Sequence, residues 1–162
     1  MTATRLIDTN ILVYRFDPRD PIKQRMASDL LRDGLSDGSV VLPHQAIIEF
    51  VAATTRTLKS SSAKPLLSQQ DALMEAESLL RQFPVLYPDS TTLSMAIRGC
   101  SAYQLSWFDA HLWAYAECFG IPEIISEDFQ HGRYYGQVRI VNPFKDDTRG
   151  IQELPALYEP KV

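Results

Sequence analysis

The sequence has little cysteine and no long apolar run. Cys100 and Cys118 are the two cysteines among 162 residues, and without a second pair nearby they exclude a cysteine-based zinc motif and a disulfide framework. Asp8 interrupts the first apolar stretch, and no later stretch approaches the roughly 20 apolar residues of a membrane span. We therefore expect a protein that folds without structural zinc or disulfides, stays out of the membrane and works in the reducing cytoplasm.

The sequence also lacks an excess of positive charge. It has 16 Lys and Arg residues against 20 Asp and Glu residues, a formal net charge of −4. A protein that coats nucleic acid through bulk positive charge is therefore excluded. The sequence contains no Gly-x-x-x-x-Gly-Lys-Ser/Thr motif, so a phosphate-cradling nucleotide site is not expected either.

What the sequence does contain is an alternation of short apolar strands and amphipathic helices. We expect strands at residues 4–7, 39–42, 85–87, 123–126 and 137–142, helices at residues 10–16, 21–35, 43–58, 68–83, 89–103 and 106–119, and a mobile connection at residues 58–65. Strands this short and apolar are typical of a mostly parallel sheet covered on both faces. We predict one α/β domain over residues 1–145, followed at residues 146–162 by a C-terminal extension of unknown role.

Four acidic residues occupy positions typical of a site in such a fold. Asp8 directly follows the first strand and Asp128 lies just after the fourth, and ligands of parallel sheets collect at the carboxyl ends of the strands. Asp109 lies in the first turn of its helix, on the face that carries apolar residues. Glu49 lies on a helix face of small residues, which leaves room for a ligand to approach.

Each acid alone also has a structural explanation. Asp8 can cap the next helix, Asp109 can form a capping box with Ser106, Glu49 can be a helix-surface carboxylate, and Asp128 can stabilise a turn. Together, however, carboxylates at an apolar sheet edge repel one another unless a cation lies among them. Mg²⁺ or Mn²⁺ takes such oxygen ligands, and one or two ions could activate water to hydrolyse a phosphodiester.

Four segments, in order along the chain, carry a family resemblance: LIDTNILVY at residues 6–14, IIEFVAA at 47–53, LSWFDAHLWAYAE at 105–117 and SEDFQHG at 126–132. With these segments the chain resembles the PIN-domain ribonucleases, and among them the VapC toxins of prokaryotic VapBC toxin–antitoxin pairs. The resemblance implies a three-layer α/β/α fold with a mostly parallel sheet of about five short strands. It also implies an endoribonuclease that depends on Mg²⁺ or Mn²⁺, forms a homodimer and is inhibited by a VapB-type antitoxin.

Position by position, the resemblance places the family's catalytic and metal-binding acids at Asp8, Glu49, Asp109 and Asp128, with small polar supporting residues at Thr9 or Asn10 and at Ser126. Glu127 does not fit the family spacing of a hydroxyl residue, any residue and Asp, so we expect it at the periphery. Because all four acids are present, the resemblance implies an active enzyme. In it, Asp8, Asp109 and Asp128 hold metal, while Glu49 positions water or a second ion.

Basic residues near these acids are candidates for contact with the RNA backbone. Residues 50–70 carry three of them and no acid, and three more lie near the turn after Asp8. The candidates are Arg15, Lys23, Arg25, Arg56, Lys59 and Lys64. In most proteins such charges are simply solvated, and Arg56 could equally pair with Glu49.

Two other functions remain open. A strand followed by Asp and a turn also begins aspartyl-phosphate phosphatases, in which Asp8 would be the nucleophile, although those enzymes need a second Asp where this chain has Asn10. Alternatively, the domain could be a non-catalytic module that binds a protein partner.

Setting the four acids aside leaves 16 acids against 16 bases, so the net charge of −4 can be the charge of the site itself.

Overall fold

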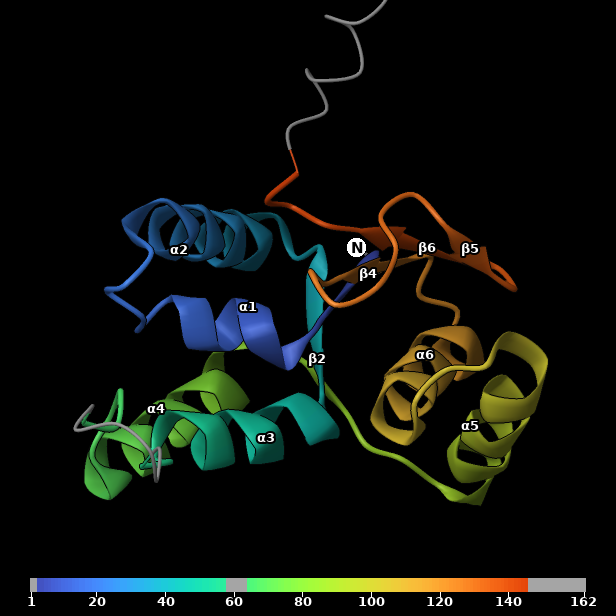
Figure 1. Ribbon diagram of the computed structural model, residues 1–162, viewed down its shortest axis with the longest axis horizontal. Coiled ribbons are helices and arrows are strands. Elements are labelled where there is room, and N and C mark those ends of the chain that lie inside the picture. The colour runs from blue at the N-terminus through green and yellow to red at the C-terminus, as the bar shows by residue number, and fades with distance from the viewer. Residues whose placement is uncertain (1–2, 58–63, 146–162) are drawn as a thin grey trace, which may run out of the picture.

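Two helices lie between each successive pair of the first four strands along the chain, and the last two strands follow without a helix between them (Figure 1). The structure is a computed structural model and describes residues 3–57 and 64–145. Its strands are β1 (Arg5–Ile7), β2 (Val40–Pro43), β3 (Val85–Leu86), β4 (Glu123–Ile125), β5 (Tyr134–Tyr135) and β6 (Val138–Val141). Its helices are α1 (Thr9–Tyr14), α2 (Pro21–Asp37), α3 (His44–Thr54), α4 (Gln69–Gln82), α5 (Ser90–Tyr103) and α6 (Trp107–Phe119). The extension at residues 146–162 and most of the connection expected at 58–65 lie outside the described residues.

The strands form one sheet in the order β3-β2-β1-β4-β6-β5. β1 pairs in parallel with strands on both sides, so that Leu6 lies opposite Val41 of β2 and Ile124 of β4. Among the described strands, β5 and β6 alone pair antiparallel. The predicted α/β fold with a mostly parallel sheet is therefore confirmed. Because the chain leaves β1 toward β2 and later returns on the other side at β4, the topological switch point lies between β1 and β4.

Each face of the sheet has its own hydrophobic core, because successive strand residues point to opposite faces. Leu6 and Ile124 are buried on the side of α5 and α6, whereas Ile7 and Ile125 are buried on the side of α1 to α4. Figure 1 shows these two helix groups on either side of the central strands. The result is the three-layer arrangement that the resemblance implied.

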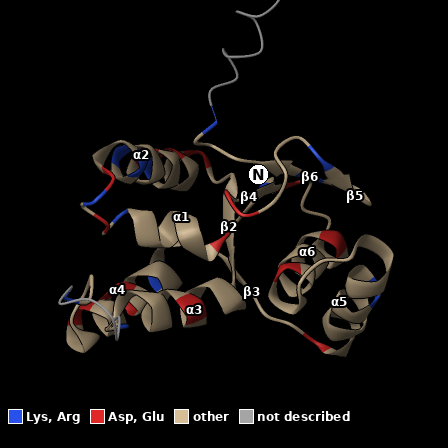
Figure 2. Cartoon of the chain, viewed as in Figure 1, with Lys and Arg blue, Asp and Glu red and all other residues tan. Residues whose placement is uncertain are grey.

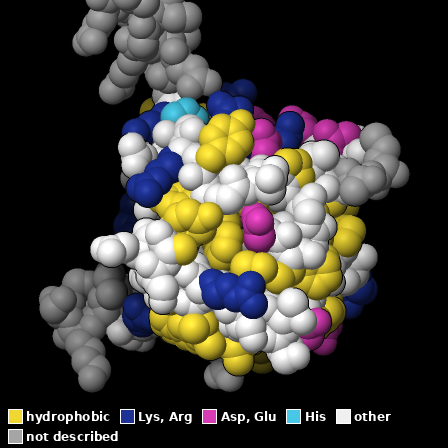
Figure 3. Space-filling view, turned by 90° about the vertical axis from the view of Figure 1, so that its right-hand side faces the viewer, with side chains coloured by type: hydrophobic (Ala, Val, Ile, Leu, Met, Phe, Trp, Pro, Cys, Tyr) yellow, Lys and Arg dark blue, Asp and Glu magenta, His cyan; other side chains and the backbone are white. Residues whose placement is uncertain are grey.

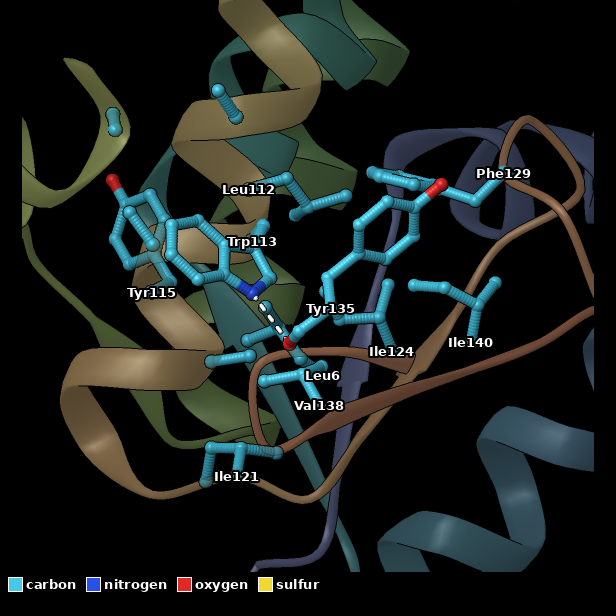
Figure 4. Close-up of a cluster of buried hydrophobic side chains, with 14 of the residues drawn as sticks. Leu6, Leu112, Trp113, Tyr115, Ile121, Ile124, Phe129, Tyr135, Val138 and Ile140 are labelled. Carbon is cyan, nitrogen blue, oxygen red and sulfur yellow. Dashed lines mark hydrogen bonds between the residues drawn. The ribbon is translucent and has the colours of Figure 1, made fainter. Parts of the chain in front are cut away.

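Trp113 of α6 connects one core to the far edge of the sheet (Figure 4). Its ring is buried, and its Nε1 donates a hydrogen bond to the backbone oxygen of Tyr135 in β5 at 2.9 Å. The indole therefore buries a large apolar surface while its one polar group stays paired.

Capping residues set the ends of the helices that carry the candidate residues. The Ser106 hydroxyl accepts a hydrogen bond from the Asp109 backbone N–H at 3.2 Å, which begins α6. Gly120 ends that helix with a φ of 67°, a left-handed conformation that glycine adopts without steric cost. Both ends were predicted from the sequence.

The predicted end of one helix was wrong. The helix expected over residues 43–58 begins at His44, with Pro43 closing β2, and ends at Thr54. The Thr54 backbone oxygen accepts from the Leu67 N–H at 3.0 Å, and the Thr55 hydroxyl donates to the Val51 oxygen at 2.7 Å. These bonds compete with the hydrogen bonds that would continue the helix.

Strand β5 was not predicted at all. It has two residues, Tyr134 and Tyr135, and returns along β6 through Gly136, which has a φ of 59°. Its two tyrosines stand between Arg133 and Gly136, without the apolar run that marks the equally short β3.

The outer surface carries exposed apolar side chains on the helices. α5 exposes Leu93 and Ile97, and Figure 3 shows groups of hydrophobic side chains on this side of the molecule. No helix within the described ranges is both long enough and apolar enough to cross a bilayer.

Candidate active site

The candidate site begins at the switch point of the sheet. Asp8 follows β1, and Ser126 follows the neighbouring strand β4. The Asp8 backbone N–H donates to the Ile125 oxygen at 3.0 Å, so the parallel pairing of β1 and β4 continues into the segment that carries the site residues. The two strand ends therefore meet at one edge, as the sequence led us to expect.

Asp8 is a buried carboxylate held by three donors. Its Oδ1 accepts from the Thr9 backbone N–H at 2.6 Å, which caps α1. Its Oδ2 accepts from the Ser126 hydroxyl at 2.5 Å and from the Asn10 side-chain amide at 3.2 Å. Burial, together with the nearby charges of Asp128 and Glu49, nevertheless raises the pKa of Asp8 to about 7 against the effect of the hydrogen bonds. The capping role and the site position thus belong to the same residue.

Asn10 bridges the two acids that follow the strands. Its Nδ2 donates to Oδ2 of Asp8 and, at 3.0 Å, to Oδ2 of Asp128. The Ser126 hydroxyl also accepts the backbone N–H of Asp128 at 3.1 Å. One amide and one hydroxyl therefore set the positions of both carboxylates.

Glu49 enters from α3 and is held by two neutral donors. The Thr9 hydroxyl donates to its Oε2 at 3.0 Å, and the Gln45 amide donates to its Oε1 at 2.7 Å. Gln45 also donates to the Phe108 backbone oxygen at 3.2 Å, which ties α3 to the first turn of α6. Within the described residues, Glu49 has no ion pair with Arg56, so that structural explanation does not hold.

Asp109 completes the set from the first turn of α6. Its backbone N–H is bonded to Ser106, and its carboxylate lines the same pocket as the other three acids. Partial burial raises the pKa of Asp109, and the charges of Asp128 and Glu49 act in the same direction. Four carboxylates from β1, α3, α6 and the segment after β4 therefore share one electrostatic environment.

The four acids line a single pocket of about 640 Å³. Figure 2 shows acidic segments at the start of α1, on α3 and on α6 around the middle of the molecule. The other lining residues come mainly from α1, the connection after it and α3: Thr9, Asn10, Val13, Tyr14, Asp17, Arg19, Gln45, Ala52, Ala53, Arg56, Phe108 and Leu112. Asp17, Arg19, Gln45 and Phe108 were not among the predicted site residues.

The donor chemistry of the pocket fits a hard divalent cation. All four acids are oxygen donors, and burial, with a smaller effect of the charges of Asp128 and Glu49, raises the pKa of Asp8. The side-chain oxygens of Asn10 and Gln45 are buried and have no hydrogen-bond partner. Within residues 3–57 and 64–145, no group of three or more side chains drawn from His, Cys, Asp and Glu is already arranged to hold a metal ion. Mg²⁺ does not need one, because it keeps several waters and takes one or two carboxylates.

Glu127 points away from the pocket. It accepts hydrogen bonds from the Tyr14 hydroxyl and from Lys23, whose Nζ lies 2.7 Å from its Oε2. Lys23 also lies over the rings of Tyr14 and Phe144. These contacts fix the segment that carries Asp128 against α1 and α2, so Glu127 has a structural partner outside the acid set.

The six basic candidates separate into two groups. Arg15 pairs with Glu75 at 3.0 Å, Lys23 with Glu127, and Arg25 with Asp29 at 3.9 Å, and of these none lines the pocket. Arg56 lines the pocket, and Lys64 lines a hollow beside it. Lys59 lies outside the described residues.

The sequence matches one known protein family. Residues 5–137 match the PIN domain family model. No curated protein sequence matches the chain significantly.

Solved structures share the fold. The toxin–antitoxin complex from Klebsiella pneumoniae is 17% identical over 90% of this chain and 100% of its own, with a TM-score of 0.62. DNA-bound VapBC from Salmonella typhimurium is 13% identical over 86% and 97%, with a TM-score of 0.61. VapC20 from Mycobacterium tuberculosis, described as a sarcin-ricin loop cleaving toxin, is 15% identical over 76% and 89%, with a TM-score of 0.56.

Proposed function

The chain belongs to the PIN domain family, and from this premise we propose that it is a VapC-type toxin, a metal-dependent endoribonuclease. The observation that carries the proposal is the convergence of Asp8, Glu49, Asp109 and Asp128 on one pocket from four separate parts of the chain. Capping alone would account for Asp8 and Asp109, but it would not account for their gathering with two further acids.

The raised pKa of Asp8 supports a cation as the missing partner of these acids. A buried carboxylate among like charges is costly to ionise, and a divalent cation reverses that cost. We propose that Asp8, Asp109 and Asp128 hold one or two Mg²⁺ or Mn²⁺ ions and that Glu49 positions water or the second ion. The bound metal lowers the pKa of a water molecule and stabilises the charge that develops on the phosphoryl oxygens.

The chain's own polar residues prepare this arrangement before any ligand binds. Ser126 and Thr9 hold Asp8, Asn10 holds Asp8 and Asp128 at a fixed separation, and the Thr9 hydroxyl orients Glu49. Because these donors are neutral, they fix the carboxylates without neutralising them. Their oxygens therefore stay available to a metal, and Asp8, whose pKa is raised to about 7, gives up its proton when the metal binds.

Two partners follow from the same proposal. Solved structures with this fold include a toxin–antitoxin complex and DNA-bound VapBC, which supports a VapB-type antitoxin for this chain. The exposed Leu93 and Ile97 on α5 support a protein contact such as a homodimer, because soluble proteins rarely leave clustered apolar side chains unused. Light scattering of the purified chain, alone and after coexpression with any small open reading frame adjacent to its gene, tests both assemblies, and a monomeric mass in both samples would contradict them.

RNA cleavage tests the proposed activity. Purified protein is incubated with RNA in Mg²⁺ or Mn²⁺, in EDTA, and after Asp109→Asn, with Asp33→Asn on the exposed face of α2 as the matched control. We expect cleavage by the wild type and the Asp33 variant with metal, and none in EDTA or by the Asp109 variant. Cleavage that survives both EDTA and Asp109→Asn would refute the metal mechanism. A phosphorylated Asp8 after incubation with a phosphate ester would instead favour the phosphatase.

A further inference from the structure

The acid pocket opens into a second hollow along the surface. This hollow measures about 420 Å³ and shares Val13, Arg19, Ala53 and Arg56 with the acid pocket. The two therefore form one continuous groove that begins at the four acids and leads away from them. We call its outer part, lined by the shared residues and by Phe16, Pro18, Lys64, Pro65 and Leu66, the basic groove.

The two walls of the basic groove carry cations. Arg19 stands on the connection between α1 and α2, whereas Arg56 and Lys64 stand on the connection between α3 and α4. All three side chains are exposed, and Arg19 keeps 68% of its side chain accessible although it pairs with Asp17. The groove outside the acid pocket therefore has the opposite charge to the pocket itself.

Two of these cations have no acidic partner among the residues that the structure describes. Arg56 and Lys64 form no ion pair with any residue in the described ranges, whereas Arg15, Lys23 and Arg25 each pair with an acid. A cation without a partner gives up little when it binds a phosphate, because no existing ion pair has to be broken. This difference selects Arg56 and Lys64 from the six basic candidates.

The floor of the groove is shallow and apolar. Ala52 and Ala53 lie about one turn beyond Glu49 on α3, and their short side chains leave the passage open. Val13 and Phe16 add apolar surface on the side of α1. Positively charged walls are typical of grooves that follow the backbone of a single strand.

We propose that the basic groove holds single-stranded RNA on one side of the scissile phosphate, with Arg56 and Lys64 bound to backbone phosphates. The inference rests on the proposed nuclease function. We assign a single strand because the hollow, at about 420 Å³, lies within the range of small-ligand pockets. An acidic peptide is the less suitable occupant, because it has no phosphodiester to present to the proposed metal site where the groove meets the four acids.

Binding and its salt dependence test the assignment. The binding of a labelled single-stranded RNA is measured by fluorescence anisotropy in Mn²⁺, with Asp109→Asn in every protein to prevent cleavage. Arg56→Gln with Lys64→Gln is compared with Arg32→Gln and Arg81→Gln, two exposed arginines that pair with acids on their own helices. All substituted side chains are exposed, so folding should be unaffected, and circular dichroism checks it.

We expect the groove variant to bind RNA of any sequence more weakly than the control variant does. The slope of log K against log salt should fall by about 1.4 for two lost phosphate contacts, at about 0.7 per contact for a single strand. An RNA affinity and slope equal to those of the control would overturn the proposal. The proposal would also be overturned if an acidic peptide displaced the RNA and if the groove substitutions lowered the affinity for the peptide as much as the affinity for RNA.

Cleavage is measured in proteins that keep Asp109, and binding is measured in the proteins that carry Asp109→Asn. The two measurements keep the two proposals apart. If the wild type cleaves RNA and the groove substitutions change neither binding nor slope, the groove proposal fails and the nuclease stands. If no cleavage occurs but RNA binding depends on Arg56 and Lys64, the groove proposal stands and the nuclease fails.

Discussion

Substitution of Asp8 by Asn should change how the stability of the metal-free protein depends on pH. Burial raises the pKa of Asp8 to about 7 from an ordinary value of 3.8. The folded chain therefore holds the proton at pH values where the unfolded chain has released it, and stability falls as pH rises from about 4 to about 7. The full penalty is about 4 kcal/mol above pH 7, a large part of the 5–15 kcal/mol typical of a domain.

About 2.5 kcal/mol of that penalty should develop between pH 5 and pH 8, from the two pKa values and the linkage relation. Asp8→Asn removes the ionisation, so the variant should lack this part of the pH dependence. At pH 8 in EDTA the variant should also have a higher free energy of unfolding than the wild type. The imperfect pairing of the new amide with the surrounding donors should reduce this gain by about 1–2 kcal/mol.

Urea unfolding at pH 5 and pH 8, in EDTA and in Mn²⁺, measures this effect. Groups far from Asp8 titrate equally in both proteins, so the comparison isolates Asp8 together with its coupling to Asp128 and Glu49, and Asp33→Asn on the surface serves as the control. Mn²⁺ should stabilise the wild type by RT ln(1 + [L]/Kd) and remove the variant's advantage at pH 8. If the wild type and Asp8→Asn lose the same free energy of unfolding between pH 5 and pH 8, the buried, destabilised carboxylate is refuted.

Two further substitutions test the support of the site and the packing of the sheet. Thr9→Val removes the hydroxyl that donates to Glu49 at 3.0 Å, so metal affinity measured by calorimetry should fall, while Thr9→Ser should retain it; equal affinities for the Val and Ser variants would contradict the role of the hydroxyl. Gly34→Ala would place a Cβ 2.2 Å from the Val40 Cγ2, and the overpacking cost of about 1–3 kcal/mol should exceed the gain of about 1 kcal/mol from helix propensity. The thermal midpoint should therefore drop, whereas it should hold for Ser36→Ala on the exposed side of the same helix; a Gly34 variant as stable as this control would refute the close contact.

Much of the sheet and the position of the acid cluster could be predicted because both depend on local pattern. Asp8 and Asp128 follow apolar strands, and the carboxyl ends of parallel strands meet at one edge. Asp109 lies three residues after a capping serine. Each of these relations spans a few residues, so the sequence displays them directly.

Local pattern did not predict the residues that hold the acids in place: the family resemblance indicated Thr9, Asn10 and Ser126 as supporting residues, and Gln45 was missed. The Thr9 hydroxyl reaches Glu49 across 40 positions, and Lys23 reaches Glu127 across 104. Gln45 looks like any polar residue of a helix until α6 is packed beside it. Such contacts arise from tertiary packing, and local propensity contains no information about them.

The central claim is that the four carboxylates form a site for a divalent cation, and calorimetric titration with Mn²⁺ tests it most directly. Titrations at pH 7 in buffers of different ionisation enthalpy report both binding and the protons released. We predict saturable binding that releases about half a proton at pH 7, as expected for a carboxyl with a pKa of about 7, and loss of binding in Asp8→Asn and Asp128→Asn but not in Asp33→Asn. Absence of binding by the wild type, or equal binding by all three variants, would contradict the account.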